Sequence, residues 1–357
     1  MPEYKEFRLG DLFTISTPKK RFNANTVKFG GKHRYVVRSE ANNGIRGYIT
    51  ENEYFLNPAN TISFGQDTTT MFFQDKPYFT GDKIKVFSLK GYTLNREISM
   101  YLIAAMKKAF VNFGWGKSSF NVNVLKEVML YLPITADDAP EYAYMESCIR
   151  GLEEVRINEL VFYLAATGLA DCKLTAGDRQ FLSTYYAGKT KYKPFQIIDI
   201  FDVKNTQSIL SRDITLNSGT TPYLTASSTN NAVGSYIAYD DRLLDKGNCI
   251  FIGGKTFVVS YQEKNFFSND SHNLALYLKE SEAKTRENQL FMAAAIYKSL
   301  SSKYSWGDSI SYKKIQTDVV NLPIDGKNCP DYAYMTAFIR IQQKLAIKKI
   351  FDWKEKK

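Results

Sequence analysis

Short runs of Val, Ile, Tyr and Phe, separated by glycine and asparagine, dominate the first hundred residues of the chain. Runs of this kind are typical of β-strands, and the glycines and asparagines between them favour turns. A short amphipathic segment, Phe7–Phe13, opens the chain, and a helix is expected over Asn95–Phe110 because its apolar residues recur every three or four positions. The pattern between them predicts strands at Tyr35–Val37, Tyr48–Thr50, Thr61–Phe64, Met71–Phe73 and Ile84–Leu89.

Two longer segments, Pro140–Leu164 and Pro330–Trp353, have helical periodicity. In the first, Met145, Ile149 and Leu152 recur at helical spacing, and the second follows the same pattern. A proline at the start of each segment suits the first turn of a helix. A helix of about 25 residues is about 37 Å long, close to the ~34–36 Å of one turn of B-DNA. Paired through their apolar faces, the helices would form a spacer; the alternative is that each caps its own domain.

The chain contains an internal duplication. FRLGDLF at Phe7–Phe13 aligns with FQIIDIF at Phe195–Phe201, and at the same offset of 188 residues Tyr35–Ile49 aligns with Tyr223–Ile237. Further pairs follow at offsets near 190: Trp115-Gly116 with Trp306-Gly307, Leu132-Pro133-Ile134 with Leu322-Pro323-Ile324, and Pro140–Met145 with Pro330–Met335. The period is far longer than that of solenoid repeats, so this is a twofold domain duplication.

The duplication predicts two copies of one architecture, an α+β fold with two similar β-rich domains separated by two long helices. The short helix of the second copy is expected at Glu287–Leu300. The expected boundaries are a first β-rich domain at 1–139, a long helix at 140–166, a connector at 167–193, a second β-rich domain at 194–329 and a second long helix at 330–357.

The charge of the chain is positive and unevenly distributed. Its 357 residues carry 47 Lys and Arg against 37 Asp and Glu, a net charge of +10. Residues 1–46 hold ten basic and four acidic side chains, and residues 340–357 hold seven basic and two acidic. Basic clusters favour a polyanionic partner, because cations displace the counterions condensed on nucleic acid. A basic surface that is simply solvated is the alternative.

Several classes of protein are disfavoured by what the sequence lacks. The apolar stretches are too short for a membrane span, and the N-terminus lacks the regions of a signal peptide, so no membrane partner is expected. The cysteines are too scattered for a disulfide framework, and no pair has the CxxC spacing of a zinc site; they are Cys148, Cys172, Cys249 and Cys329. We therefore expect a cytoplasmic protein.

No catalytic constellation is recognisable. The segment from Asn57 to Asn60 lacks the second proline and the aromatic residue of a DNA amino-methyltransferase loop. Gly253–Thr256 ends like a phosphate-binding loop but lacks the upstream glycine, so we expect a turn between strands. His33 and His272 are expected in loops or at the surface, which leaves little material for metal sites or Ser-His-Asp chemistry. The chain is interpreted as a binding protein without its own cofactor or metal.

The twice-repeated order of FxLGDLF, NNGIxGYI, a Trp-Gly turn, Leu-Pro-Ile and a long helix resembles the specificity (S) subunits of Type I restriction-modification systems, and equally the S-like subunits of Type IIB systems. The resemblance covers nearly the whole chain. It implies two target recognition domains that each read half of a split DNA sequence, an antiparallel coiled-coil spacer with pseudo-two-fold symmetry, and no catalysis in this chain. Tyr-Ala-Tyr-Met at the start of both long helices departs from the usual Type I pattern, so the subtype stays open.

The resemblance also implies the partners. These are double-stranded DNA, two DNA methyltransferase subunits that methylate adenine with S-adenosylmethionine, and, in Type I complexes, ATP-dependent restriction subunits. The cofactor then belongs to the partner methyltransferase and not to this chain.

Candidate DNA-contacting residues follow from the chemistry of readout. Base edges specify sequence, phosphates add affinity, and loops on a rigid scaffold carry the side chains. In the first copy the candidates are Arg38, Asn42, Asn43, Arg46, Gln66, Asp67, Thr68, Thr69, Thr70, Lys117, Ser118 and Ser119. In the second copy they are Ser227, Ser228, Asn230, Asn231, Lys255, Thr256, Asp308 and Ser309. Phosphate contacts suit Lys19, Lys20, Arg21 and Lys32.

Two interpretations stay open for the residues that both copies share. Either the Asn-Asn pairs read bases, or they only shape a turn, since asparagine tolerates left-handed backbone. Trp115 and Trp306 are interpreted as structural. Domains that read different half-sites should differ where they read, which favours the pairs Arg38/Ala226, Arg46/Gly234 and Asp67/Lys255.

Two other functions remain as alternatives to a DNA-specificity subunit. One is a duplicated protein-interaction scaffold, such as a decoy subunit that binds a methyltransferase without reading DNA. The other is an enzyme of nucleic-acid metabolism whose active site is not recognisable in the sequence.

Overall fold

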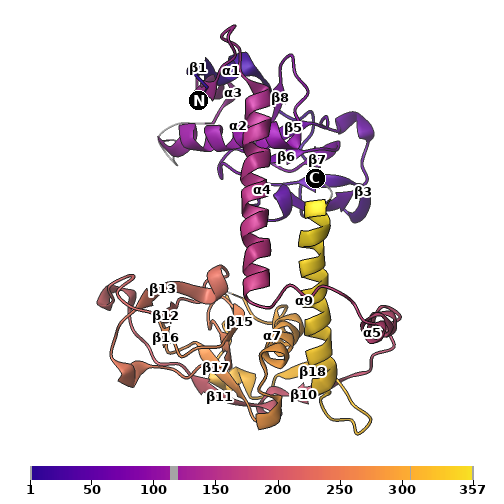
Figure 1. Ribbon diagram of the computed structural model, residues 1–357, viewed down its shortest axis with the longest axis vertical. Coiled ribbons are helices and arrows are strands. Elements are labelled where there is room, and N and C mark those ends of the chain that lie inside the picture. Colours follow the sequence, from indigo (N-terminus) through magenta and orange to yellow (C-terminus); the bar gives the residue numbers. More distant parts are fainter. Residues whose placement is uncertain (1, 113–119, 306, 356–357) are drawn as a thin grey trace. The chain divides into compact units, whose positions relative to one another are not determined.

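The structure is a computed structural model that describes residues 2–112, 120–305 and 307–355. The chain divides into two compact units, Met1–Phe162 and Tyr163–Lys357, each with mixed α/β structure (Figure 1). The strands and α-helices follow in the same order in both units, apart from one additional α-helix at the start of the second. The duplication predicted from the sequence is therefore a duplication of the fold.

Three small sheets form the β-structure of the first unit. The first pairs β1 (Tyr4–Arg8) with β9 (Met129–Pro133) antiparallel. The second is antiparallel, in the order β2 (Phe13–Ser16), β8 (Ile84–Leu89), β5 (Thr61–Gly65) and β6 (Met71–Gln74). The third has the order β4 (Ile45–Ile49), β3 (Phe29–Val36) and β7 (Tyr78–Thr80), with β3 and β7 parallel. A strand is found at each of the five predicted positions.

The second unit repeats these sheets. The first pairs β10 (Tyr192–Gln196) with β18 (Val319–Pro323). The second has the order β11 (Phe201–Asn205), β17 (Leu274–Leu278), β14 (Cys249–Ile252) and β15 (Val259–Gln262). The third has the order β13 (Val233–Ile237), β12 (Thr221–Leu224) and β16 (Phe267–Ser268). Even the register is repeated, because Tyr35 pairs with Phe79 and Tyr223 with Phe267.

Helices complete each unit. In the first they are α1 (Leu9–Leu12), α2 (Arg96–Ala109), α3 (Val122–Lys126) and the long α4 (Tyr142–Ala166). In the second they are α5 (Ala176–Tyr186), α6 (Ile197–Ile200), α7 (Arg286–Leu300), α8 (Tyr312–Ile315) and the long α9 (Tyr332–Glu355). Single 3-10 turns are η1 (Asn42–Gly44), η2 (Glu53–Phe55), η3 (Phe110–Asn112), η4 (Ser211–Asp213), η5 (Asn230–Ala232), η6 (Asp241–Leu243) and η7 (Ser281–Ala283).

The predicted helix over Asn95–Phe110 is confirmed as α2, and its sequence explains both its start and its packing. Asn95 caps the N-terminus, because its side-chain oxygen accepts from the backbone N–H of Ile98 at 2.8 Å. Ile98 and Leu102 are fully buried, and they belong to one core cluster with Phe64 and Phe87 of the four-stranded sheet. This apolar face holds the helix on the sheet that supports the loops described below.

A methionine anchors each long helix to its own domain. Met145 of α4 is fully buried in the core of the first unit, and Met335 of α9 is fully buried in that of the second. Figure 1 shows α7 beside α9, and the two helices are in contact. The prolines lie differently from the prediction. Pro140 and Pro330 precede the helices and form isolated β-bridges with Ile134 and Ile324, so the helical segments start two residues later.

The connector contains a helix that the sequence analysis did not foresee. Helix α5 starts with a capping box, in which Thr175 and Asp178 bond each other's backbone N–H. Its Phe181 ring lies 4.6 Å from that of Tyr334 on α9, and the Lys344 ammonium lies 3.0 Å from the Asp178 carboxylate. α5 therefore packs on α9 within the second unit.

Candidate nucleic-acid interface

A surface hollow of about 1190 Å³ in the first unit brings together side chains that the sequence analysis singled out. Arg21, Arg38, Arg46 and Thr68 all line it, although they come from four separate segments. Tyr35 also lines the hollow, although only 1% of this residue is exposed to solvent. Three arginines around one hollow form a site that fits a polyanion, because guanidinium groups bind phosphates and guanine edges in bidentate fashion.

Arg38 and Asp67 form an ion pair, and Lys83 joins it. The Arg38 guanidinium donates to Asp67 Oδ2, and the Lys83 ammonium lies 2.8 Å from the same oxygen. The hydrogen bond from Lys83, together with the Arg38 charge, keeps the pKa of Asp67 below its usual range. Asp67 thus stays ionised and orients two cations. Among the residues that the structure describes, no carboxylate forms an ion pair with Arg46.

The basic segment expected to contact phosphates is held against aromatic rings. The ammonium of Lys19 lies 4.0 Å from the centre of the Tyr54 ring, and that of Lys20 lies 4.8 Å from Phe22. The next residue of this segment, Arg21, donates to Asp82 at 2.7 Å. The fourth candidate, Lys32, has a 77% exposed side chain at 3.8 Å from Glu53. These cations remain accessible to solvent.

The two Asn-Asn pairs shape turns, as one of the two interpretations proposed. Asn42 and Asn43 have φ of 49° and 52°, and Asn230 and Asn231 have 49° and 51°. Their side chains also bond within the fold, since Asn42 Nδ2 donates to the carbonyl of Ile45 at 3.1 Å and Asn230 Nδ2 makes the equivalent bond. Both pairs are therefore structural in their backbone; a base contact by their amides stays a prediction.

The loop between β5 and β6 carries Gln66 to Thr70 and closes tightly on itself. The hydroxyls of Thr68 and Thr70 are 2.9 Å apart, and Thr69 has φ of 53°. A Cβ on Gly65 would lie 2.4 Å from the Thr70 hydroxyl, so only glycine allows this closure. Thr70 is buried and Thr68 is exposed. Thr68 is therefore the better placed of the two to contact a ligand.

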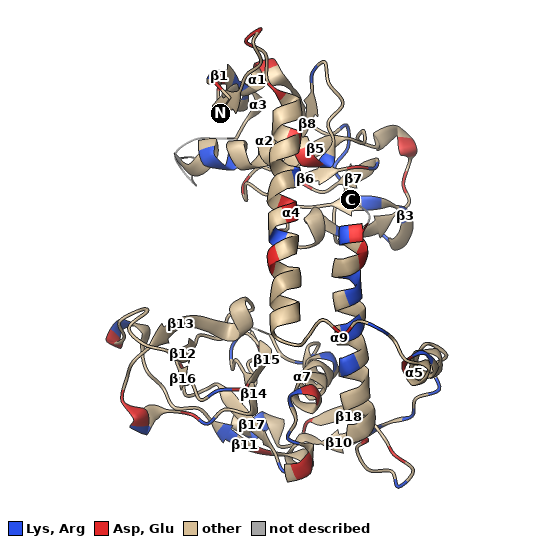
Figure 2. Cartoon of the chain, viewed as in Figure 1, with Lys and Arg blue, Asp and Glu red and all other residues tan. Residues whose placement is uncertain are grey.

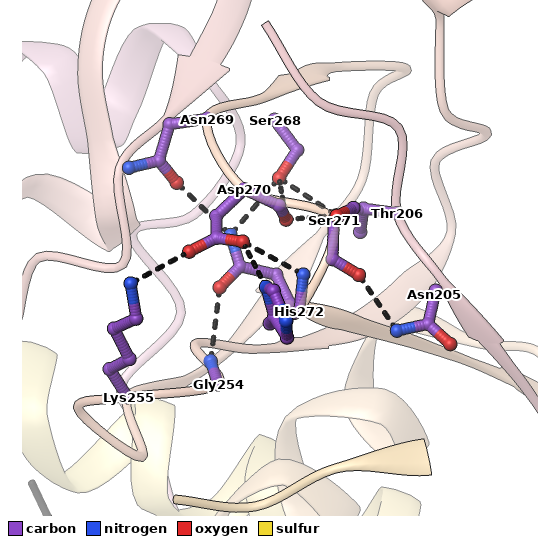
Figure 3. A network of polar contacts seen from close by, with 10 residues as sticks. Asn205, Thr206, Gly254, Lys255, Ser268, Asn269, Asp270, Ser271 and His272 are labelled. Carbon is purple, nitrogen blue, oxygen red and sulfur yellow. Dashed lines mark hydrogen bonds and ion pairs between the residues drawn. The ribbon is translucent and has the colours of Figure 1, made fainter. Parts of the chain in front are cut away.

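The candidate loops of the second unit are held by side-chain hydrogen bonds that differ from those of the first unit. Thr256 donates to the carbonyl of Ala226 at 2.8 Å, Ser227 contacts Thr229 at 2.9 Å, and Ser228 is exposed. Lys255 lies 3.3 Å from Asp270, in the network of Figure 3. As expected, Gly253–Thr256 forms the turn between β14 and β15.

The last candidate segment of the second unit is tied to α8. Asp308 is ion-paired with Lys314, whose ammonium also bonds the carbonyl of Ser309 at 2.7 Å. The matching candidates of the first unit, Lys117, Ser118 and Ser119, lie outside the described residues. So do Trp115 and Trp306, whose structural interpretation stays a prediction.

Sequence reasoning missed two aspartates of these loops, Asp82 and Asp270, and misplaced one histidine. Asp82 and Asp270 organise the cations beside them, and their common offset of 188 residues was the signal that could have identified them. His272 lies in a loop as expected, but it bonds Asp270 at 2.7 Å. His33, expected in a loop or at the surface, lies instead within β3, with a 17% exposed side chain 3.1 Å from Glu53.

Basic residues also lie along the last helix, α9. Figure 2 shows Lys and Arg along α9, where Arg340, Lys344 and Lys348 recur every four residues and so share a face. Part of this charge is compensated within the second unit, because Arg340 lies 3.3 Å from Glu287 and Lys344 contacts Asp178. The basic excess of 340–357 is therefore not all available to DNA.

Within the described residues, no group of three or more His, Cys, Asp or Glu side chains is arranged to hold a metal ion. In the same part of the chain, no helix combines the length and apolarity needed to cross a membrane.

Comparison with known proteins identifies the family. The model of the Type I restriction modification DNA specificity domain matches residues 1–161 and again residues 189–350. Specificity subunit S.BcgI of a Type II restriction enzyme from Heyndrickxia coagulans is 22% identical over 350 residues, which are 96% of each chain.

Two solved structures are similar over most of their length. The S subunit of a Type-I restriction-modification system from M. genitalium is 15% identical, with 98% of this chain and 92% of that chain covered and a TM-score of 0.48. The HsdS subunit from Thermoanaerobacter tengcongensis is 13% identical, with 98% and 92% covered and a TM-score of 0.33.

The family model matches each half of the chain separately, in agreement with the duplicated fold. This match favours neither the scaffold nor the enzyme alternative, because the family is one of DNA recognition and assembly with restriction-modification partners. The chain therefore belongs to the Type I restriction modification DNA specificity domain family and is a specificity subunit of a restriction-modification system, with two copies of that domain.

Proposed function

We propose that this specificity subunit reads a bipartite, interrupted DNA target, with one half-site for each β-rich domain. The two target recognition domains are residues 1–139 and 194–329. One observation carries the proposal: the two domains share strands, register and turns but differ in the polar side chains that their loops expose. A common scaffold with different loops is what the reading of two different half-sites requires.

Three equivalent pairs of candidate positions differ in charge. Arg38 has Ala226 as its counterpart, Arg46 has Gly234, and Asp67 has Lys255. Arg38 and Arg46 both line the hollow of the first unit, where a guanidinium can donate to guanine O6 and N7. We infer that these arginines read bases in one half-site, and that Lys255 reads bases in the other.

The remaining candidates take supporting roles in this proposal. Lys19, Lys20 and Lys32, which are basic and accessible, contact phosphates and add affinity without sequence preference. Gln66, Thr68 and Thr69 in the first domain contact DNA from the loop between β5 and β6. In the second domain the supporting contacts come from Ser227, Ser228, Thr256, Asp308 and Ser309.

We further propose that the long helices, residues 140–166 and 330–357, pair antiparallel and set the distance between the half-sites. Helix α4 has 25 residues and α9 has 24, so each is about 37 Å long. This length is close to one turn of B-DNA, ~34–36 Å. Two such rods would present the domains to successive turns on one side of the duplex, related by a pseudo-two-fold axis.

Methylation itself is assigned to partner subunits. In this proposal two methyltransferase subunits, each with S-adenosylmethionine, dock on the cytoplasmic specificity subunit and modify adenine after extruding it from the duplex. ATP-dependent restriction subunits join the complex if the system is of Type I. Connector 167–193 carries the chain from the first copy into the second.

Methylome sequencing tests the proposed function. The full chain is expressed with its neighbouring methyltransferase gene in a host that lacks other DNA methylation. We expect methylated adenines in a two-part sequence with an unspecified spacer, whose two parts differ. Methylation of one uninterrupted sequence, or methylation that does not depend on this chain, would contradict the proposal.

A further inference from the structure

Both domains carry an aspartate at the same place, in the loop that follows β7 in one and β16 in the other. Phe79 and Phe267 are the equivalent partners of the central strands, and Asp82 and Asp270 each come three residues later. A residue that both domains share, in a region where their loops otherwise diverge, points to a role common to both.

In the first domain this aspartate holds an arginine. Arg21 Nη1 donates to Asp82 Oδ1 at 2.7 Å, and both side chains, each 58% exposed, line the hollow. The backbone positions the pair, because Arg21 forms a β-bridge with Thr80 and the next N–H, that of Phe22, donates to the Thr80 carbonyl at 2.9 Å. The guanidinium is thus held in the hollow by a carboxylate from a neighbouring loop.

In the second domain the equivalent aspartate holds two other side chains, as Figure 3 shows. The Nδ1 atom of His272 lies 2.7 Å from Asp270 Oδ1, and the Lys255 ammonium lies 3.3 Å from Oδ2. Asp270 is only 26% exposed, whereas Lys255 is 63% and His272 is 73% exposed. The mostly buried carboxylate of Asp270 therefore holds two side chains, Lys255 and His272, that are accessible to solvent.

Hydrogen bonds inside the fold fix the loop that carries Asp270. The Thr206 hydroxyl donates to the backbone carbonyl of Asp270 at 2.9 Å. Asn273, 2% exposed, accepts from the backbone N–H of Gly254 at 3.0 Å, which ties the loop to the turn that carries Lys255. Because these bonds are made by the scaffold, the separation of Asp270 and Lys255 is set before any DNA is present.

The side chains that are held differ between the domains, although the aspartate does not. In the first domain the position equivalent to Lys255 is an aspartate, Asp67. The cation that pairs with Asp82 therefore comes from another segment, as Arg21. The loop of the second domain is also one residue longer, because the offset rises from 188 at Asp270 to 189 at Leu276, the equivalent of Phe87. The same aspartate thus pairs with Arg21 in the first domain and with Lys255 and His272 in the second.

We propose that Asp82 and Asp270 are positioning residues for DNA reading: Asp82 orients Arg21 toward one half-site, and Asp270 orients Lys255 and His272 toward the other. This inference rests on the proposed function. A long cationic side chain that is already held in one orientation loses less rotational freedom on binding, so its hydrogen bonds to base edges become more selective. The aspartates act through the donors and touch no base themselves.

The test uses the full chain with its methyltransferase subunits and DNA libraries randomised at each base pair of both half-sites, with methylation read by sequencing. Asp270→Asn keeps the shape of the side chain and removes its charge. We expect it to lower discrimination in one half-site by about tenfold and leave the other unchanged. Asp82→Asn should do the same in the opposite half-site. Asp240→Asn, an aspartate of the second domain that is paired with Arg242, is the matched control.

Combined variants separate positioning from direct contact. If Asp270 acts through its partners, adding Asp270→Asn to a Lys255→Ala, His272→Ala variant changes discrimination little further. Additive losses would show that Asp270 contacts DNA itself and would overturn the proposal. Equal losses in both half-sites, together with a lower Tm, would overturn it as well. A wild-type complex that methylates no two-part sequence would contradict the proposed function instead, and this is seen before any variant is compared.

Discussion

Tyr35 and Tyr223 are equivalent residues of the two domains, and each donates the same buried hydrogen bond. The Tyr35 hydroxyl donates to the carbonyl of Phe22 at 2.6 Å, and that of Tyr223 donates to the carbonyl of Ile209 at 2.7 Å. Both rings are 1% exposed. In the first domain the bond fixes the residue that directly follows Arg21, so a core tyrosine helps to place a side chain of the hollow.

Removing either hydroxyl is expected to destabilise its domain. Tyr35→Phe and Tyr223→Phe each leave a buried carbonyl without its donor, which costs about 1–3 kcal/mol. Urea unfolding followed by circular dichroism measures the loss. Tyr48→Phe and Tyr236→Phe serve as controls, because these equivalent tyrosines are 48% and 46% exposed. A loss of similar size in the controls would contradict the assignment.

Arg46 and Lys20 should affect DNA binding in different ways. Arg46→Ala is expected to relax preference at one base pair of a single half-site by about 1–3 kcal/mol, whereas Lys20→Ala should weaken binding to all sequences and lower the salt slope by about one. Competition binding of the assembled complex with variant DNAs at several salt concentrations distinguishes the two. Equal losses on every sequence for Arg46→Ala would remove Arg46 from the base-reading residues.

Asp245 is expected to make the second domain less stable as pH rises. Burial raises the pKa of its carboxyl to about 6 from 3.8, so the folded state holds the proton more tightly than the unfolded state. The protonated group favours folding fully below pH ~4, and this contribution is lost as the pH rises through ~6. The first domain carries Asn57 at the equivalent position, where its amide donates to the carbonyl of Tyr78 at 3.0 Å.

Asp245→Asn should therefore gain stability relative to wild type between pH 4 and pH 8. We expect a gain of about 1 kcal/mol in the free energy of unfolding. This is less than the whole pKa shift would correspond to, because the carboxylate is partly solvated. Unfolding free energies of both proteins across this pH range give the difference directly. A difference that stays constant with pH would show that Asp245 titrates normally.

The cysteines should differ strongly in reactivity. Cys249 is fully buried on β14, and burial raises the pKa of its thiol to about 12, so almost no thiolate is present at neutral pH. Cys329 is exposed. With iodoacetamide at pH 8 we expect Cys329 to be alkylated in the folded protein and Cys249 only after unfolding. Mass spectrometry of the digested protein identifies the modified sites, and rapid labelling of Cys249 in folded protein would refute its burial.

Much of the fold was predictable from the sequence, because apolar periodicity is a local property. The five strands of the first domain, α2 and the two long helices lie where Val, Ile, Tyr and Phe runs or helical spacing indicated. The duplication was visible because both copies must fill the same kind of core; Met145 and Met335, for example, are buried in equivalent places. Helix α5 was missed, since its sequence gives a weak apolar pattern and it is held on α9 by contacts of Phe181 with Tyr334 and of Asp178 with Lys344.

The sequence alone also determined the kind of protein this is, through the order and repetition of its motifs. Only the tertiary structure decided which polar side chains meet. Arg21 and Asp82 are 61 residues apart, and the hydrogen bond between them depends on a β-bridge to Thr80 that no local pattern encodes. Periodicity reports which face of a strand is buried, whereas the partner of an exposed charge depends on which loops the folded sheets bring together.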